Sequence, residues 1–379
     1  MTYFDSSQRP DPSTWTYAAP APATPTAAPA RTGRIVSLVL SAALLAGVSG
    51  GAVGAALSDG GQPPATGRTA ATPASLDAAP AAPAEAISRV AARVLPSVVS
   101  VEVRSRAGSG SGSGVVLDDA GHILTNNHVV ESGVQGEIFV VFDDGRRVPA
   151  QIVGRDAVTD LAVLEVKDVE GLRPIDLGSS ADVTVGDAVI AIGSPLGLTG
   201  TVTTGIVSAL DRTVRTTPES PLLGAIQTDA AINPGNSGGA LVDGTGRLIG
   251  INTAISSTTG GSVGLGFAIP VDQARSIAEE LIRTGRASHP SLGVAATTVT
   301  NDDGTRGALL QDVTTGSSAA EAGLREGDLV VAVDGTDVGS VDELVLALRA
   351  EGVGARVSVG YVRDGDDRQA DVLLADRRA

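Results

Sequence analysis

From about Ile87 onward, the chain shows short apolar runs that alternate with turns rich in Gly, Asp and Asn. Runs of this length and spacing are typical of short β-strands in a barrel or sandwich, and not of alternating strands and helices. We therefore expect a mainly β fold in this part of the chain. The predicted strands are Ser97–Val103, Gly114–Leu117, Ile138–Phe142, Leu161–Val166, Ala188–Ile192, Val202–Leu210 and Leu248–Ile255.

Two later segments have helical spacing instead. The first has one apolar face from Ala274 to Ile282, with Asp272 placed to cap its start and Gly285 placed to end it. A boundary near residue 287 leaves about 90 residues, which is enough for a small separate domain. The second helix, within that domain, is Val341–Arg349, with one apolar face formed by Val341, Leu344, Val345 and Leu348.

Residues 1–85 differ from the rest of the chain. Residues 1–34 are rich in Pro, Ala, Thr and Ser, which predicts a disordered tail, and residues 58–85 have the composition of a linker. Residues 35–57 contain no charge and would span about 34 Å as a helix, enough to cross a bilayer core. Arg31 and Arg34 precede this segment, which predicts a single-pass helix with a cytoplasmic N-terminus. A cleaved signal peptide is the alternative, but the segment is long for one and starts late.

Composition limits the chemistry. The absence of cysteine removes disulfides, a Cys nucleophile and thiolate metal sites. The three histidines, His122, His128 and His289, are too scattered for a His-rich metal site, so we expect neither a metal nor a cofactor. A formal net charge of −16 argues against a nucleic-acid partner, because phosphate binding needs a basic surface.

Three motifs carry candidate chemistry. His128 follows a predicted strand in LTNNHVV, Asp160 opens an apolar strand in TDLAVL, and Ser237 lies in the glycine-rich turn NPGNSGG. A serine hydroxyl becomes a nucleophile only when a base takes its proton, and imidazole suits that task near neutral pH. A carboxylate behind the imidazole fixes its tautomer. These three residues therefore form a predicted catalytic triad.

The glycines around Ser237 allow a sharp turn that aims backbone amides at an oxyanion. We expect the oxyanion hole within Gly235, Asn236 and Ser237, with the amides of Gly235 and Ser237 as donors.

The alternative interpretation is the nucleophile elbow of the α/β-hydrolases, which also has the pattern Gly-x-Ser-x-Gly. That class needs the order Ser, Asp, His, whereas only His289 follows Ser237 here. The order His, Asp, Ser on a β-rich chain matches the chymotrypsin-type arrangement instead. Each motif alone is weak, and the combination is what indicates a protease.

The motifs LTNNHVV, TDLAVL, GNSGGAL and LGFAIP, in this order, resemble those of the HtrA (Deg) proteases from about Ala86 to the C-terminus. The resemblance implies a double six-stranded β-barrel with the triad in the cleft, in residues 86–286. It also implies ATP-independent cleavage of unfolded or damaged proteins outside the cytoplasm, by a homo-trimer or larger assembly.

The same resemblance makes Ala231–Asn236 and Thr253–Gly261 activation and specificity loops. Their side chains are small or aliphatic, and no Asp stands out as a receptor for Arg or Lys, so we expect cleavage after Val, Ala or Ile. The residues predicted to bind substrate are Ile232, Thr253, Ala254 and Ile255. Between the first two strands the chain has only Arg104–Gly112, without the long regulatory loop of some relatives.

Residues 287–379 resemble the PDZ domain that follows the protease in HtrA proteins, through SLGV at Ser291–Val294 and SAAEAGLREGD at Ser318–Asp328. Such domains bind a peptide C-terminus by strand addition. The backbone amides of Leu292, Gly293 and Val294 are then predicted to bind the carboxylate, and Leu344 and Leu348 to line the side-chain pocket. A small α/β domain without a ligand is the alternative. The GLGF sequence at Gly264–Phe267 precedes the first helix and belongs to the last strands of the protease.

Two functions from different classes remain at this point. One is an active membrane-anchored protease whose PDZ domain recognises peptides. The other is a membrane-tethered peptide-binding or chaperone module with an inactive protease fold. The intact triad motifs favour the first.

Overall fold

The computed structural model describes residues 83–377 with the exception of 107, 195–199, 216–220, 256–261 and 302–303. The predicted tail 1–34, the predicted transmembrane segment 35–57 and nearly all of the predicted linker 58–85 lie outside the described residues. Among the residues that are described, no helix is both long and apolar enough to span a membrane.

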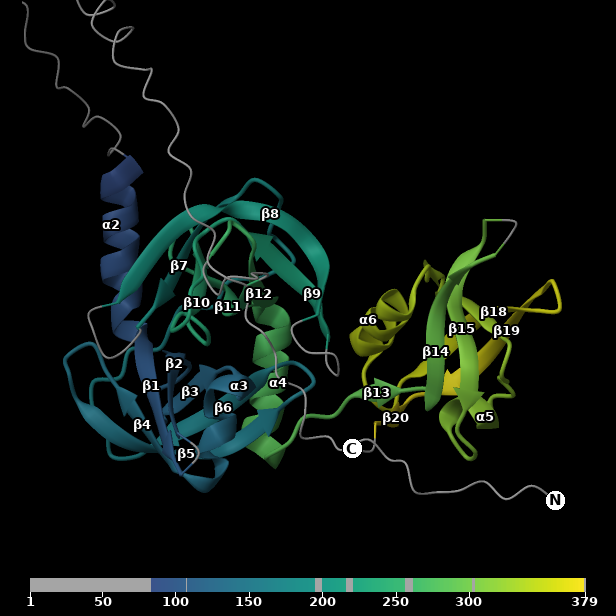
Figure 1. Cartoon of the computed structure of the whole chain (residues 1–379), viewed down its shortest axis with the longest axis horizontal. Helices are drawn as coiled ribbons and strands as arrows, with labels where there is room; N and C mark the ends of the chain where they lie inside the picture. The colour runs from purple at the N-terminus through teal and green to yellow at the C-terminus, as the bar shows by residue number, and fades with distance from the viewer. Residues whose placement is uncertain are drawn as a thin grey trace, which may run out of the picture. The chain divides into compact units, whose positions relative to one another are not determined.

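The first barrel is closed by six antiparallel strands in the order β1-β2-β3-β6-β5-β4 (Figure 1). Closure leaves no strand edge unpaired. A short helix, α3 (Asn127–Val130), and a 3₁₀ turn (Glu131–Gln135) follow the third strand. The strands are β1 (Val98–Ser105), β2 (Gly108–Val116), β3 (His122–Thr125), β4 (Glu137–Val141), β5 (Arg147–Asp156) and β6 (Leu161–Val166).

The second barrel is closed in the same way, in the order β10-β11-β12-β9-β8-β7. Its longest strand, β8, bends at three register shifts against β9. The strands are β7 (Ala188–Gly193), β8 (Thr201–Arg215), β9 (Pro221–Thr228), β10 (Ala240–Asp243), β11 (Leu248–Ile255) and β12 (Gly266–Pro270).

Strand β6 shows why the predicted strands are continuously apolar. Ala162 and Leu164 belong to the core inside the first barrel, whereas Leu161 and Val163 belong to a core shared by both barrels. Successive side chains of a strand point to opposite faces, so a strand buried on both faces must be apolar throughout. The shared core also contains Val98, Val115 and Leu124 from the first barrel, and Ile190, Ile192, Ala240, Val242, Leu248 and Ile251 from the second.

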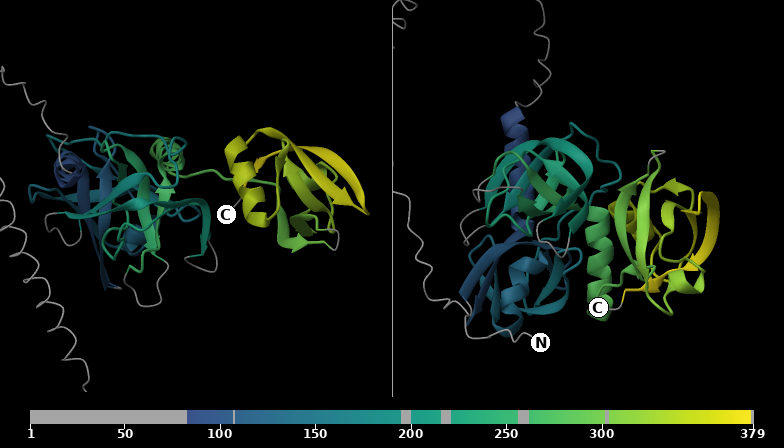
Figure 2. Two further views of the ribbon diagram at one scale, coloured as in Figure 1. Left: turned by 90° about the horizontal axis from the view of Figure 1, so that it is seen from above. Right: turned by 45° about the vertical axis from the view of Figure 1, so that its right-hand side comes forward.

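Helix α4 (Val271–Thr284) packs along β5 and β6 of the first barrel and β11 and β12 of the second (Figures 1 and 2). It ends as predicted at Gly285, which has φ of 78° and donates its amide to the Leu281 carbonyl at 2.8 Å. The predicted role of Asp272 was wrong. Its carboxylate accepts from the amide and hydroxyl of Ser180, at 2.8 Å each, because it lies one residue inside the helix and faces that loop.

Helix α2 (Pro83–Val94) precedes the 3₁₀ turn Leu95–Ser97 and the first barrel. The sequence did not predict this helix, and it begins inside the segment that we expected to be a linker. Its Val94 is buried in the shared core and Val90 packs against that core. Its sequence, PAEAISRVAARV, has an apolar face and is rich in good helix formers, and packing of that face on the shared core stabilises the helix.

The C-terminal domain has its own core and an antiparallel sheet in the order β14-β15-β16-β18-β19, with β17 paired to β16. Ser340 caps helix α6 by accepting the Glu343 amide. The remaining elements are β13 (Pro290–Ser291), β14 (Val294–Thr300), β15 (Arg306–Val313), α5 (Ser318–Glu321), β16 (Leu329–Val333), β17 (Thr336–Asp337), α6 (Val341–Glu351), β18 (Arg356–Arg363), β19 (Asp366–Leu373) and β20 (Ala375–Asp376), which pairs with β13.

The mainly β architecture with two barrels and a small α/β domain is confirmed, and each of the seven predicted strands is present. Within the two barrels, strands β5, β9 and β10 were missed, and the strands of the C-terminal domain were not predicted individually. One boundary was wrong, because residues 108–113, expected to form a loop, are the first part of β2.

Candidate active site

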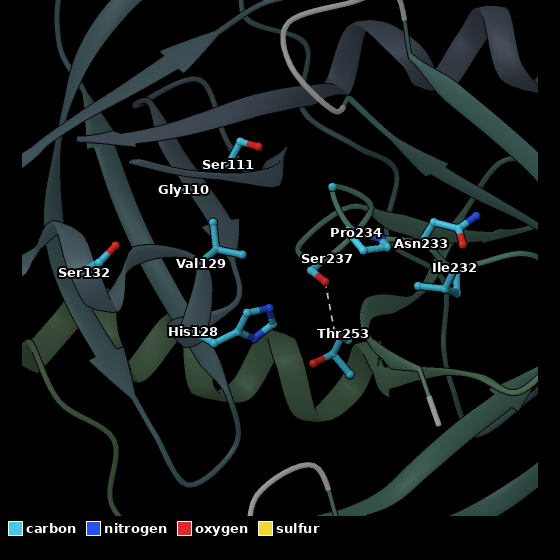
Figure 3. Close-up of a pocket in the computed structure, with 11 residues that line it drawn as sticks. Gly110, Ser111, His128, Val129, Ser132, Ile232, Asn233, Pro234, Ser237 and Thr253 are labelled. Carbon is cyan, nitrogen blue, oxygen red and sulfur yellow. Dashed lines mark hydrogen bonds between the residues drawn. The ribbon is translucent and has the colours of Figure 1, made fainter. Parts of the chain in front are cut away.

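One cavity of about 330 Å³ is lined by residues of both barrels. Figure 3 shows His128 on one side and Ser237 on the other, with both side chains directed into it. The first barrel contributes Gly110, Ser111, His128, Val129 and Ser132, and the second contributes Ile232, Asn233, Pro234, Gly235, Ser237 and Thr253.

His128 is held by Asp160. Helix α3 places His128 directly after β3, and Asp160 immediately precedes β6, which pairs with β3. The carboxylate accepts from the His128 backbone amide at 3.0 Å and lies 2.8 Å from the ring Nδ1. Thr253 Oγ1 donates to the same carboxylate at 2.6 Å. Because Nδ1–H faces the carboxylate, Nε2 of the neutral ring is the nitrogen that can accept a proton.

The backbone of Asp160 is in the left-handed region, with φ of 57°, which Asp, Asn and Gly tolerate better than other residues. Its carbonyl accepts from the Asn127 amide at 3.1 Å and from Nδ2 of the fully buried Asn126 at 2.9 Å. These two hydrogen bonds fix the backbone from which the carboxylate projects.

Asp156 organises the turn that leads to Asp160. Its carboxylate accepts from the amides of Val158 and Thr159, and from Nε2 of His289 at 3.0 Å. Burial opposes ionisation of Asp156, but hydrogen bonds from His289 and Thr159 outweigh it and hold the pKa of this carboxyl below its usual range. His289 is therefore paired with Asp156 and does not line the cavity. The order Ser, Asp, His of the α/β-hydrolases would need this histidine beside Ser237, so the structure does not support that interpretation.

Glycines allow the turn that carries Ser237 to contact the first barrel. Gly235 and Gly238 have φ of 101° and 84°. A Cβ atom on Gly238 would lie 2.1 Å from the Ser113 carbonyl oxygen, so only glycine permits this approach. The Ser113 amide donates to the Ser237 carbonyl at 2.8 Å. The serine of one barrel is thereby brought to the histidine of the other.

The Ser237 hydroxyl donates to the Thr253 backbone carbonyl at 3.0 Å, the dashed line in Figure 3. Within the described part of the chain, no hydrogen bond joins this hydroxyl to His128. A rotation about the Cα–Cβ bond of Ser237 must therefore precede transfer of its proton to the imidazole.

The backbone amides of the turn differ in what they bind. The Asn236 amide donates to the Asn233 carbonyl at 2.9 Å. The amides of Gly235 and Ser237 have no acceptor among the described residues, and both residues line the cavity. Of the three residues predicted for the oxyanion hole, Gly235 and Ser237 offer an unused donor and Asn236 does not.

The second barrel forms the side of the cavity where substrate binding was predicted. Ile232 and Thr253, two of the four residues predicted there, line it, and Ile232 is buried. The side chains of Ala254 and Ile255 lie outside the described residues. No Asp, Glu, Lys or Arg is among the described residues that line this cavity.

Sequence reasoning missed three contributions to the site. Asn126 lies within a quoted motif, but its bond to the Asp160 carbonyl is not visible in the sequence. Thr253 was assigned to substrate binding alone, whereas its hydroxyl contacts a residue 93 positions away. Ser113 lies in a Gly/Ser run that has the composition of a linker, and no sequence signal marks it.

A second cavity, of about 270 Å³, lies beside β14 and α6 in the C-terminal domain. Strand β14 ends the sheet order, so one of its edges is available for an added strand. The Gly293 amide, one of the three predicted to bind the peptide carboxylate, donates to Ser291 Oγ at 3.0 Å. Four of the five residues predicted to bind a peptide line this cavity: Leu292, Val294, Leu344 and Leu348.

Comparison with known proteins identifies both domains. Residues 112–251 match the trypsin-like peptidase domain family and residues 290–374 match the PDZ domain family. The serine protease PepD of Mycobacterium tuberculosis is 47% identical over 361 residues, which cover 89% of this chain and 77% of PepD. The solved structure of the HtrA-type protease AlgW with a tripeptide superimposes with a TM-score of 0.68 and 36% identity, covering 77% of this chain and 98% of AlgW.

The chain belongs to the HtrA family of serine proteases.

As a member of that family, this HtrA protease is a serine endopeptidase with a PDZ domain, as the sequence motifs implied. The periplasmic serine endoprotease DegP of Escherichia coli K12 is 40% identical over 269 residues. The match covers 69% of the HtrA chain described here and 56% of DegP.

We expect Asp160→Asn to lower kcat by about 10⁴, because an amide no longer fixes the His128 tautomer or stabilises the imidazolium. Asn tolerates the left-handed backbone, so the turn is retained. Asp211, also with a positive φ of 54° but exposed on β8, is the matched control. Its change to Asn should leave kcat unaltered in the same peptide-cleavage assay. Equal activity of the two variants would contradict the role given to Asp160.

Proposed function

We propose that this chain is an ATP-independent serine endopeptidase that degrades unfolded or damaged proteins outside the cytoplasm, with His128, Asp160 and Ser237 as its catalytic triad. The observation that carries the proposal is the His128–Asp160 pair facing Ser237 across one cavity that two barrels build together. Peptide-bond hydrolysis needs only water as co-substrate, and an unfolded chain reaches the cavity without mechanical unfolding.

In the proposed reaction, Ser237 Oγ attacks the scissile carbonyl carbon while His128 Nε2 takes its proton. The carbonyl oxygen becomes an oxyanion that accepts hydrogen bonds from the Gly235 and Ser237 amides. His128 then gives its proton to the leaving amine, which departs as the acyl-enzyme forms. Water repeats the sequence on the acyl-enzyme and releases the acid.

The alternative function, a peptide-binding module with an inactive protease fold, draws on one specific observation. The Ser237 hydroxyl binds the Thr253 carbonyl in this structure rather than His128. A single side-chain rotation separates the two arrangements, however, and its barrier is small compared with that of the chemical step. We therefore favour an active protease with a resting hydroxyl position.

The cavity lining supports a preference for small aliphatic residues at the cleaved bond. An Arg or Lys side chain in a cavity without a carboxylate would be desolvated and unpaired, which is costly. Val, Ala or Ile would instead enter a cavity whose described lining has no acidic residue, Lys or Arg, without leaving a charge unpaired.

The extracytoplasmic location rests on the predicted membrane helix at residues 35–57 and on relatives named as periplasmic endoproteases. The cytoplasmic N-terminus, the single membrane anchor and a homo-trimeric or larger assembly belong to the same proposal. The PDZ domain is proposed to bind the C-termini of peptides or unfolded chains at β14.

Ser237→Ala removes the proposed nucleophile, and we expect it to abolish casein degradation, a loss of about 10⁶ in kcat. The full-length protein in mild detergent should degrade casein without added ATP. The variant should unfold at the same temperature as the wild type. If neither protein cleaves casein, even with a C-terminal peptide ligand added, the binding-module function replaces the protease function.

The same casein digest tests the proposed preference for small aliphatic residues, when the cleavage sites are mapped by mass spectrometry. Cleavage should fall mainly after Val, Ala and Ile. Cleavage mainly after Arg or Lys would show that the proposed specificity is wrong.

For the PDZ domain, we expect a peptide that ends in a free valine carboxylate to bind at least about tenfold more tightly than the same peptide with a C-terminal amide. Hydrogen bonds to a charged group contribute about 1.5–3 kcal/mol, and the amide loses that charge. Fluorescence anisotropy with labelled peptides measures both affinities. Equal affinities would rule out recognition of the carboxylate.

A further inference from the structure

Ser113 is a hydroxyl residue of the first barrel that contacts the nucleophile turn of the second. It lies on β2, is fully buried and does not line the catalytic cavity. Its Oγ donates to the Gly235 carbonyl at 2.6 Å and accepts from the Ser194 amide at 2.8 Å. Its backbone amide donates to the Ser237 carbonyl. One residue therefore holds the turn at two carbonyl groups.

Gly235 needs such a restraint. Its φ of 101° is open to glycine, but glycine adopts negative values just as readily. The peptide group between Gly235 and Asn236 is hydrogen-bonded at both ends. Its carbonyl oxygen accepts from Ser113 Oγ, and its N–H, which belongs to Asn236, donates to the Asn233 carbonyl. The N–H of Gly235 belongs to the preceding peptide group. Fixing the following plane therefore holds the Gly235 Cα atom, and only rotation about φ and ψ of Gly235 can redirect its amide.

The donor of this restraint is fully buried, and the Gly235 carbonyl that accepts from it is half-buried. A short hydrogen bond that is shielded from water is stronger than an exposed one, and a buried carbonyl without a donor is correspondingly unfavourable. If the Ser113 hydroxyl is removed, the carbonyl of Gly235 loses the donor that the described residues give it. The turn is then expected to rotate toward another partner and to carry the Gly235 amide with it.

We propose that Ser113 is a positioning residue for acyl transfer, whose hydroxyl fixes Gly235 so that the Gly235 amide meets the developing oxyanion. The inference rests on the proposed function, in which Ser237 is the nucleophile. It adds a residue that touches no substrate and acts through the oxyanion donor.

Ser100 is a matched control on the neighbouring strand. It pairs directly with Ser113 across β1 and β2 and is equally buried. Its hydroxyl has no hydrogen-bond partner among the residues that the structure describes. The two serines thus share residue type, burial and location, and they differ in the contact with the turn.

The experiment measures kcat and KM of the full-length protein in mild detergent, with an internally quenched casein peptide that the wild type cleaves. We expect Ser113→Ala to lower kcat about 10- to 100-fold, somewhat less than deletion of an oxyanion donor, with KM unchanged within about twofold. Ser100→Ala should keep the wild-type kcat. Ser113→Cys retains the shape with a weaker donor and should fall between them.

A second measurement separates positioning from general damage. A peptide boronate forms a tetrahedral adduct on serine that imitates the transition state, whereas the cleaved product peptide does not. The boronate affinity of Ser113→Ala should fall by the same factor as kcat/KM, with product affinity unchanged. A folded Ser113→Ala with kcat within twofold of wild type overturns the inference, as does an equal loss of both affinities. If the alanine variant shows no cooperative unfolding, the cysteine variant decides by the same criteria.

Failure of this inference is distinct from failure of the proposed function. If the wild-type protein cleaves the casein peptide no faster than Ser237→Ala, the proposed function is wrong. A wild-type protein that cleaves, beside a Ser113→Ala variant that cleaves equally well, defeats only the role of Ser113.

Discussion

The turn that carries Ser237 lies directly against strand β2, and a hydrogen bond from the Ser113 amide to the Ser237 carbonyl joins the two backbones. At Gly238 a Cβ atom would lie 2.1 Å from the Ser113 carbonyl oxygen, and at Gly112 it would lie 2.6 Å from the Val129 side chain. Real Cβ atoms do not approach other atoms so closely. Any other residue at Gly238 would push the barrels apart, and any other residue at Gly112 would displace Val129 within the first barrel. Because His128 belongs to one barrel and Ser237 to the other, this contact sets the distance on which the proposed catalysis depends.

The shared core and Thr253 support the same contact. Strands of both barrels and helix α4 bury their outer faces in one cluster, which opposes separation of the barrels through burial of apolar surface. Thr253 then links two members of the proposed triad, since its hydroxyl donates to Asp160 and its carbonyl accepts from Ser237. The second barrel therefore takes part in holding the carboxylate of the first. The same residue gives the Ser237 hydroxyl its resting position.

The sequence predicted those features that depend on local pattern. The apolar runs predicted seven strands, and the helical spacing with Gly285 predicted α4, because a face buried in a core must be apolar whatever its partners are. The triad was predicted because three unusual residue types occurred in the chymotrypsin order. Contacts between distant segments were not predictable. The run at residues 108–114 has a composition typical of a linker, yet it forms β2, because only glycine fits where Val129 and the Ser237 turn approach. Asp272 and Asn126 likewise bind partners that no spacing in the sequence reveals.

The central claim, that His128 activates Ser237 as the nucleophile, is tested most directly by covalent labelling. The full-length protein would be treated with a fluorophosphonate and analysed by mass spectrometry of its peptides, beside His128→Ala and heat-denatured protein. We predict one adduct, on the peptide that contains Ser237, in the folded wild type alone, because phosphonylation needs an activated serine hydroxyl. An adduct on a different serine, or equal labelling of Ser237 in the His128→Ala variant, would contradict the account.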